Sequence, residues 1–200
     1  MHWSMKLRTS IAALATAVLL GSCSFFGGNT LDVQTSHAVK AAPVGVAVEI
    51  NWKERTDQPY VFLELLGDYS LTRRQLEALA KHAFGQGVAP SGPPFALFYD
   101  DPARVAPIDR RSRICLPVTG PIQVASPLGY DVLPSEPVVY GFVRGAYRDL
   151  ESAYGGVFEY MGSRSWVLTG PIREIYLTDP GSVRGPEELV AELQMPWRPL

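Results

Sequence analysis

Histidine is scarce in this chain of 200 residues, which contains three: His2, His37 and His82. Only His82 falls in the region that we expect to fold, and it stands alone on a predicted helix. A histidine-based metal site needs several ligands close together, and a Ser-His-Asp triad needs a histidine between a serine and an acid. A glycine-rich phosphate loop of known spacing is also missing. These absences exclude the common metal, triad and nucleotide chemistries, and we expect no metal and no cofactor.

The chain also lacks a basic surface. It carries 18 Lys and Arg against 20 Asp and Glu, for a net charge of −2. Lys6 and Arg8 lie in the segment 1–22, which holds no acid, so 16 basic and 20 acidic side chains remain, a net charge of −4. Because a nucleic-acid surface requires a concentrated positive field, we expect no nucleic-acid partner.

The apolar run at the amino terminus, Ile11 to Leu20, is shorter than the roughly 20 apolar residues of a comfortable membrane span. Two basic residues precede it, a pattern typical of a secretory signal peptide. The run ends in Leu-Gly-Ser-Cys, which resembles the bacterial lipobox, in which the cysteine becomes the lipidated first residue. We therefore predict a lipoprotein signal peptide over residues 1–22 and lipidation of Cys23. The alternative is an ordinary signal peptide, or an uncleaved anchor, with an incidental cysteine.

The residues after Cys23 predict the location of the protein. Ser24 stands where an Asp would mark retention in the inner membrane. We therefore expect a cell-envelope protein, lipid-anchored and facing the periplasm, in the outer membrane rather than the inner one. Residues 23–45 are rich in small and polar residues without periodicity, which predicts a flexible tether. Cys115 is then the one cysteine left, so no internal disulfide forms, and we expect a small buried residue in a strand.

The rest of the chain, residues 46–200, contains one pattern twice. The segment 59–102 aligns with the segment 137–180 without a gap. The matching pairs fall at turns and aromatic positions, and include Gly67 with Gly145, Tyr69 with Tyr147, Gly92 with Gly170 and Asp101 with Asp179. Self-similarity at a fixed period indicates a repeated structural unit. We predict two copies, at about 46–118 and 129–197, within a single monomeric domain.

Each copy is predicted to fold as β-α-β-β. The expected first strands are 60–66 and 138–144, and the expected helices are 72–84 and 150–161. The second strands are expected at 95–99 and 173–177, and the last strands at 113–118 and 190–195. An extra strand precedes each copy, at 46–52 and 129–133. Leu76, Leu79 and Ala83 have the spacing of an amphipathic helix. The predicted fold is α+β, with duplicated β-α-β-β units, pseudo-twofold symmetry, two antiparallel sheets each packed on a helix, and a ligand cleft between the copies.

One position breaks the repeat, because Glu174 of the second copy corresponds to Ala96 of the first. Side chains alternate along a strand, so Glu174 should share a face with Tyr176, which corresponds to Phe98. The first strands also alternate between an aliphatic face and a face with aromatic residues, such as Tyr140 and Phe142. Two such aromatic faces meeting across the pseudo-twofold axis would enclose a carboxylate in rings, an arrangement suited to cations.

Several segments resemble the GyrI-like domain, which is also the effector-binding domain of bacterial multidrug-responsive transcription activators. They are "GPPFALFYDDP", "VVYGFVRGAYRDLESAYGGVFEYM" and "GPIREIYLTDP". The resemblance extends from about Val46 to Leu200. It implies a small-molecule cleft between the copies, in which a Glu ringed by aromatics holds cationic or amphipathic ligands, and Glu174 is the matching residue. Some stand-alone members resemble hydrolases of reactive electrophiles that use the same Glu.

The candidate ligand-binding residues are therefore Glu174, Tyr176, Tyr140, Phe142, Phe98, Tyr147 and Trp166. The alternative for Glu174 is a structural ion pair, for which Arg144 is the candidate partner. The aromatic residues could instead pack in the core, and Trp166 could cover either the pocket or the core. With Glu174 unpaired, Glu174→Gln should keep or slightly raise stability.

Three functions follow. The first is an envelope protein that binds amphipathic or cationic small molecules without catalysis. The second is a hydrolase in which Glu174 is the catalytic base or nucleophile. The third is an interaction module for another envelope protein. An open aromatic cleft around Glu174 would favour the first two, and a filled one the third.

Overall fold

The computed structural model describes residues 47–200. The predicted signal peptide, the lipidation site at Cys23 and the tether lie outside the described residues. The strands are β1 (Ala47–Arg55), β2 (Gln58–Leu66), β3 (Phe95–Phe98), β4 (Arg111–Pro117), β5 (Gly129–Leu133), β6 (Glu136–Arg144), β7 (Trp166–Leu168), β8 (Ile172–Tyr176) and β9 (Val190–Pro199). The α-helices are α1 (Leu76–Gly85) and α2 (Tyr154–Gly162), and no helix within residues 47–200 is long and apolar enough to cross a membrane.

The strands form one antiparallel sheet in the order β1-β6-β9-β8-β3-β4-β2-β5, with β7 added beside β9. The expectation of two sheets is wrong, because β3 and β8 pair with each other at the centre of the sheet. This pairing joins the halves and gives each strand a partner for backbone groups that an open edge would leave unpaired. The α+β class stands.

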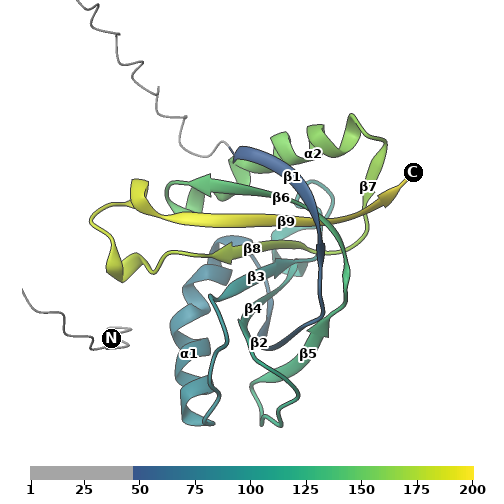
Figure 1. Ribbon diagram of the computed structural model, residues 1–200. Coiled ribbons are helices and arrows are strands. Elements are labelled where there is room, and N and C mark those ends of the chain that lie inside the picture. Colours follow the sequence, from purple (N-terminus) through teal and green to yellow (C-terminus); the bar gives the residue numbers. More distant parts are fainter. Residues whose placement is uncertain (1–46) are drawn as a thin grey trace, which may run out of the picture. The chain divides into compact units, whose positions relative to one another are not determined.

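The sheet is strongly curved. Residues 56–57 alone connect β1 to β2, although these strands lie near opposite ends of the strand order. Two residues span less than about 10 Å, so the end of β1 must approach the start of β2. Figure 1 shows β1 running from its place beside β6 toward the end of the sheet that contains β2.

Both helices follow a glycine turn and begin as a 3-10 helix. Gly67 and Gly145 have φ angles of +133° and +125°, which side chains rarely tolerate. The 3-10 helices η1 (Tyr69–Gln75) and η3 (Tyr147–Ala153) come next, so the α-helical parts begin later than the predicted 72 and 150. Asp68 caps η1 by accepting a hydrogen bond from the Ser70 amide at 2.8 Å.

The two helices cover one face of the sheet at separate places, with α1 against β2 and β4 and α2 against β1, β6 and β7 (Figure 1). We call this the helix-covered face. Leu79 and Ala83 of α1, and Val157 and Met161 of α2, pack into its core. The opposite face carries a second cluster, made of Tyr60, Phe62, Phe95, Leu97, Cys115, Leu133 and Ile175. Cys115 is fully buried there, as predicted.

Candidate functional site

Glu174 lies at the middle of the sheet, where β8 pairs with β3. It is directly opposite Ala96 of β3 and Leu193 of β9. Directly opposed residues of antiparallel strands share a face, so all three lie on the helix-covered face, where Ala96 and Leu193 belong to the core. Glu174 is 0% exposed. A buried carboxylate is costly unless donors surround it, so its neighbours decide what it can do.

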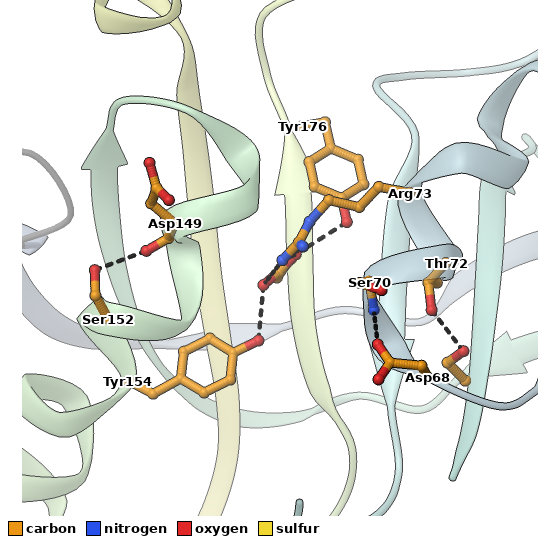
Figure 2. Close-up of polar contacts among 10 residues, drawn as sticks. Asp68, Ser70, Thr72, Arg73, Asp149, Ser152, Tyr154 and Tyr176 are labelled. Carbon is orange, nitrogen blue, oxygen red and sulfur yellow. Dashed lines mark hydrogen bonds and ion pairs between the residues drawn. The ribbon is translucent and has the colours of Figure 1, made fainter. Parts of the chain in front are cut away.

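Three side chains donate to this carboxylate. Arg73 of η1 donates from Nη2 to Oε1 and Oε2, both at 2.7 Å, and from Nε to Oε2 at 3.1 Å. Tyr154, the first residue of α2, donates its hydroxyl to Oε1 at 2.7 Å, and Tyr176 donates to Oε2 at 2.9 Å. Figure 2 shows Arg73, Tyr154 and Tyr176 converging from different elements. Both carboxylate oxygens are thus fully hydrogen-bonded.

Burial and charge fix the protonation of the donors. Burial raises the pKa values of the Tyr154 and Tyr176 hydroxyls well above their ordinary value, and the charge of Glu174 raises them further. Burial by itself would lower the pKa of Arg73, but the charge of Glu174, its hydrogen bond and the neighbouring Tyr176 and Tyr154 together outweigh burial, and the net shift is upward. The cluster is therefore a charged carboxylate–guanidinium pair with two neutral hydroxyl donors.

The cluster draws on both halves of the chain. In the repeat, Glu174, Tyr154 and Tyr176 correspond to Ala96, Leu76 and Phe98 of the first half, none of which has a polar side chain. Arg73 comes from the first half and corresponds to Glu151 in the second. The predicted copies thus differ in polarity at three of the positions that form the cluster, and in the sign of the charge at the fourth.

Two further candidates lie beside the cluster. The ring of Phe98 lies 5.9 Å from the guanidinium carbon of Arg73. The ring of Tyr147 lies 4.9 Å from that of Tyr176, and its hydroxyl donates to the carbonyl oxygen of Thr178 at 2.6 Å. The ring of Tyr147 therefore packs against Tyr176, while its hydroxyl is hydrogen-bonded to the backbone.

Tyr140 and Phe142 do not belong to the cluster. Tyr140 is opposite Gln194, which is opposite Arg173, so all three lie on the face away from Glu174. Phe142 is likewise opposite Glu192. Alternation within each strand was predicted correctly. Whether Tyr140 and Phe142 share a face with Glu174 depends on how β6 and β8 each pair with β9. This register cannot be read from the sequence of a single strand.

Trp166 lies on β7, where its ring stacks on Trp197 with 3.5 Å between centroids. Its other ring contacts are with Trp52 and Tyr160, so it covers this aromatic group and not Glu174.

The predicted ion-pair partner Arg144 is also elsewhere. It lines a cavity of about 300 Å³ with Glu49, Phe142, Leu177 and Val190. The actual partner, Arg73, was missed, because no pattern within a strand shows which distant turn reaches it. The change from Arg73 to Glu151 between the two halves was the available signal.

Protein atoms fill the space around the carboxylate. The 300 Å³ cavity and a second one of about 100 Å³, beside Gly67 and Thr72, are both lined by residues other than Glu174. Within residues 47–200, no three His, Cys, Asp or Glu residues are grouped so that they could hold a metal ion. The filled site is the outcome that favours an interaction module, unless Arg73 itself occupies the place of a ligand.

Comparison with known proteins identifies the domain. The sequence model of the GyrI-like small molecule binding domain matches residues 48–198. No curated protein matches the chain significantly.

Three solved structures illustrate the similarity of fold. The EcmrR C-terminal domain has a TM-score of 0.65 at 18% identity, over 76% of this chain and 98% of that one, whereas this chain spans 58% of EcmrR in its DNA complex. A hydrolase from Listeria innocua has a TM-score of 0.53 at 13% identity, over 79% and 94% of the two chains. SAV2435 bound to tetraphenylphosphonium has a TM-score of 0.50 at 14% identity, over 75% and 94%. Such identities show the fold alone.

Proposed function

The chain belongs to the GyrI-like small-molecule-binding domain family, and from this premise we propose that it binds amphipathic cations at Glu174, in the place that Arg73 holds in this structure. The observation that carries the proposal is the contact itself. The guanidinium of Arg73 is a cation on a buried carboxylate, flanked by two tyrosine hydroxyls and the Phe98 ring. Arg73 is thus an internal occupant of a cation site.

Arg73 is the partner that can leave. Its side chain is 20% exposed and comes from a short 3-10 helix, whereas Glu174 is 0% exposed and is fixed in the central strand. A released guanidinium can be hydrated at the surface, while the buried carboxylate still requires a positive partner. A ligand cation would supply it, and its apolar groups would contact the aromatic rings. The neighbour SAV2435 contains tetraphenylphosphonium, a bulky aromatic cation of this kind.

Competition from Arg73 should weaken binding. A ligand can bind only in the fraction of molecules whose Arg73 has moved away, so the apparent affinity falls in proportion to that fraction. Removing Arg73 should therefore strengthen the binding of cations, and removing the Glu174 charge should weaken it.

The contacts favour binding over hydrolysis. A hydrolase needs a carboxylate oxygen free to take a proton or attack an electrophile. Even when Arg73 has moved away, each oxygen of Glu174 still accepts a hydrogen bond from a tyrosine hydroxyl, Oε1 from Tyr154 and Oε2 from Tyr176.

Calorimetric titration with tetraphenylphosphonium tests the proposed function. Compared with the unmodified chain, Glu174→Gln should bind at least about 10-fold more weakly, the scale of one charge-assisted contact. Arg73→Met should bind more tightly. Arg74→Met removes the exposed neighbouring arginine and is the matched control, for which we expect no change. Equal affinities of the unmodified chain and Glu174→Gln would refute the role of Glu174.

We also propose that the protein acts as a lipid-anchored monomer in the cell envelope, on the basis of the signal-like segment that ends at Cys23. Mass spectrometry of the mature amino terminus tests this location. A lipid-modified Cys23 is expected, and a chain that begins at Met1 would contradict the proposal.

A further inference from the structure

Arg173, the residue before Glu174, points to the opposite face of the sheet. It is opposite Leu97 on one side and Gln194 on the other. It is 5% exposed, and its guanidinium carbon lies 4.0 Å from the centre of the Phe95 ring. A guanidinium this deeply buried should have a carboxylate partner, since an unpaired buried charge is costly.

Three other basic residues on this face have such partners. The pairs are Lys53–Glu192 at 2.5 Å, Arg55–Glu136 at 2.5 Å and Arg113–Asp131 at 2.8 Å, and Glu64 also lies 3.9 Å from Arg113. Among residues 47–200, Arg173 has no ion-pair partner, and its single hydrogen bond runs from Nη1 to Oε1 of Gln194 at 3.3 Å. Arg173 is therefore a buried cation of this face that has no direct ion pair.

Neither Cys115 nor Tyr60 supplies a negative partner for Arg173. Burial raises the pKa values of the Cys115 thiol and the Tyr60 hydroxyl, so both stay neutral at physiological pH. Burial, and then the charge of Arg55, lower the pKa of Arg173 to about 10, which still leaves it protonated near pH 7. Arg55 adds a like charge, and Glu192 acts on Arg173 through its charge without forming an ion pair with it, so the protonated guanidinium has no direct carboxylate partner.

The unused edge of the guanidinium indicates the missing partner. The Nε atom of Arg173 is buried without an acceptor, and Nη2 donates to no described residue. Arg73 uses these same two atoms to hold the carboxylate of Glu174, at 3.1 and 2.7 Å. This edge of arginine matches two oxygens of a carboxylate or phosphate.

We propose that the Nε–Nη2 edge of Arg173 binds the oxyanion group, a carboxylate or a phosphate, of a small acidic ligand. Phe95 beneath the guanidinium and Tyr60 beside Phe95, at 5.4 Å between ring centres, give the ligand an apolar surrounding. A ligand oxygen must displace the side chains that enclose Nε, so binding is coupled to a local rearrangement. The site is separate from Glu174, because the sheet lies between them.

The test is thermal unfolding of the full-length chain in sodium phosphate and in sodium benzoate, each compared with sodium perchlorate at equal ionic strength. At anion concentrations well above the Kd, the unmodified chain should gain about 3 °C or more in Tm with at least one of the two anions. Arg173→Met should show no such gain. Arg104→Met, which removes a surface arginine with an 85% exposed side chain, should respond as the unmodified chain does.

A second readout separates a ligand site from a structural role. In perchlorate, Arg173→Met should be at least as stable as the unmodified chain, because it removes an unpaired buried charge while keeping the volume. A response to phosphate alone would assign a phosphate group, and a response to benzoate alone would assign a carboxylate. The proposal is overturned if neither anion raises the Tm, if Arg173→Met responds equally, or if Arg173→Met has a clearly lower Tm in perchlorate.

Discussion

Arg173 and Glu174 are consecutive residues of β8, and the surroundings of their charges differ. Glu174 faces the helices and is held by a guanidinium and two hydroxyls, all from other positions of the same chain. Arg173 faces away from them and has one long hydrogen bond to an amide. In β3, the residues opposite them are Ala96 and Leu97, so the sheet itself needs neither charge at this place. One charge has a direct partner within the chain, and for the other we propose a partner from outside.

The largest expected difference between the two charges is in stability. Glu174→Gln should lower the free energy of unfolding by about 3 kcal/mol, because it leaves the largely buried Arg73 without its counter-charge. This reverses the expectation from the sequence alone, in which no partner was known. Urea unfolding measures the loss.

The matched control is Glu64→Gln, in which a 62% exposed side chain 3.9 Å from Arg113 loses its charge. Its effect should stay within about 0.5 kcal/mol. Equal effects of the two substitutions would remove the distinction between a paired buried charge and a surface one.

A double-mutant cycle sharpens the comparison. Arg73→Met alone leaves the buried carboxylate without a counter-charge, and Glu174→Gln alone leaves the guanidinium without one. The double variant leaves no buried charge without a partner, so its loss of stability should be smaller than the sum of the single losses by about 2 kcal/mol. Additive losses in urea unfolding would mean that the two side chains do not interact in solution.

Alkaline pH tests the two tyrosines that hold Glu174. Their folded pKa values are raised, so the unfolded chain loses these protons first and stability should fall as pH rises above about 10. Each tyrosine contributes up to about 1.4 kcal/mol per pH unit. Tyr154→Phe should flatten the fall between pH 10 and 11, and adding Tyr176→Phe should flatten it further. An unchanged slope in both variants would contradict the enclosed position of these hydroxyls.

The smallest expected effect concerns two tyrosines at matching positions of the two halves. The Tyr69 hydroxyl donates to the carbonyl oxygen of Asp100 at 3.0 Å, and at the equivalent place in the second half Tyr147 donates to Thr178. Tyr69→Phe and Tyr147→Phe should therefore each cost about 1 kcal/mol in urea unfolding. A large effect of one and none of the other would show that the repeat in sequence does not extend to energetics.

The sequence predicts the strands well, because their signals are local. Alternating residues and Asp-Pro breaks place β3 and β8 within one or two residues, and β5 at Gly129–Leu133 was predicted at its observed bounds. The strand β7 was missed, because three residues pairing with the end of β9 carry almost no pattern. The 3-10 starts of both helices were missed for the same reason.

Contacts between distant elements were harder to predict. The break in the repeat drew attention to Glu174, but its partner comes from a turn 101 residues away. The sequence could not show that β3 and β8 join the halves into one sheet, and this register also decides which aromatic residues share a face with Glu174. Tyr176 and Phe98 were placed correctly relative to Glu174, because their relation is alternation within a strand or its repeat.

Chemical rescue tests most directly the central claim that Arg73 occupies a cation site. Arg73→Ala removes the guanidinium, and millimolar methylguanidinium supplies a free one of similar shape. The Tm of Arg73→Ala should then rise by several degrees, as expected for a charge-assisted contact of about 1.5–3 kcal/mol. The unmodified chain and the Arg73→Ala, Glu174→Gln double variant should not respond. An equal response of the single and double variants, or no response of either, would contradict a cation site at Glu174.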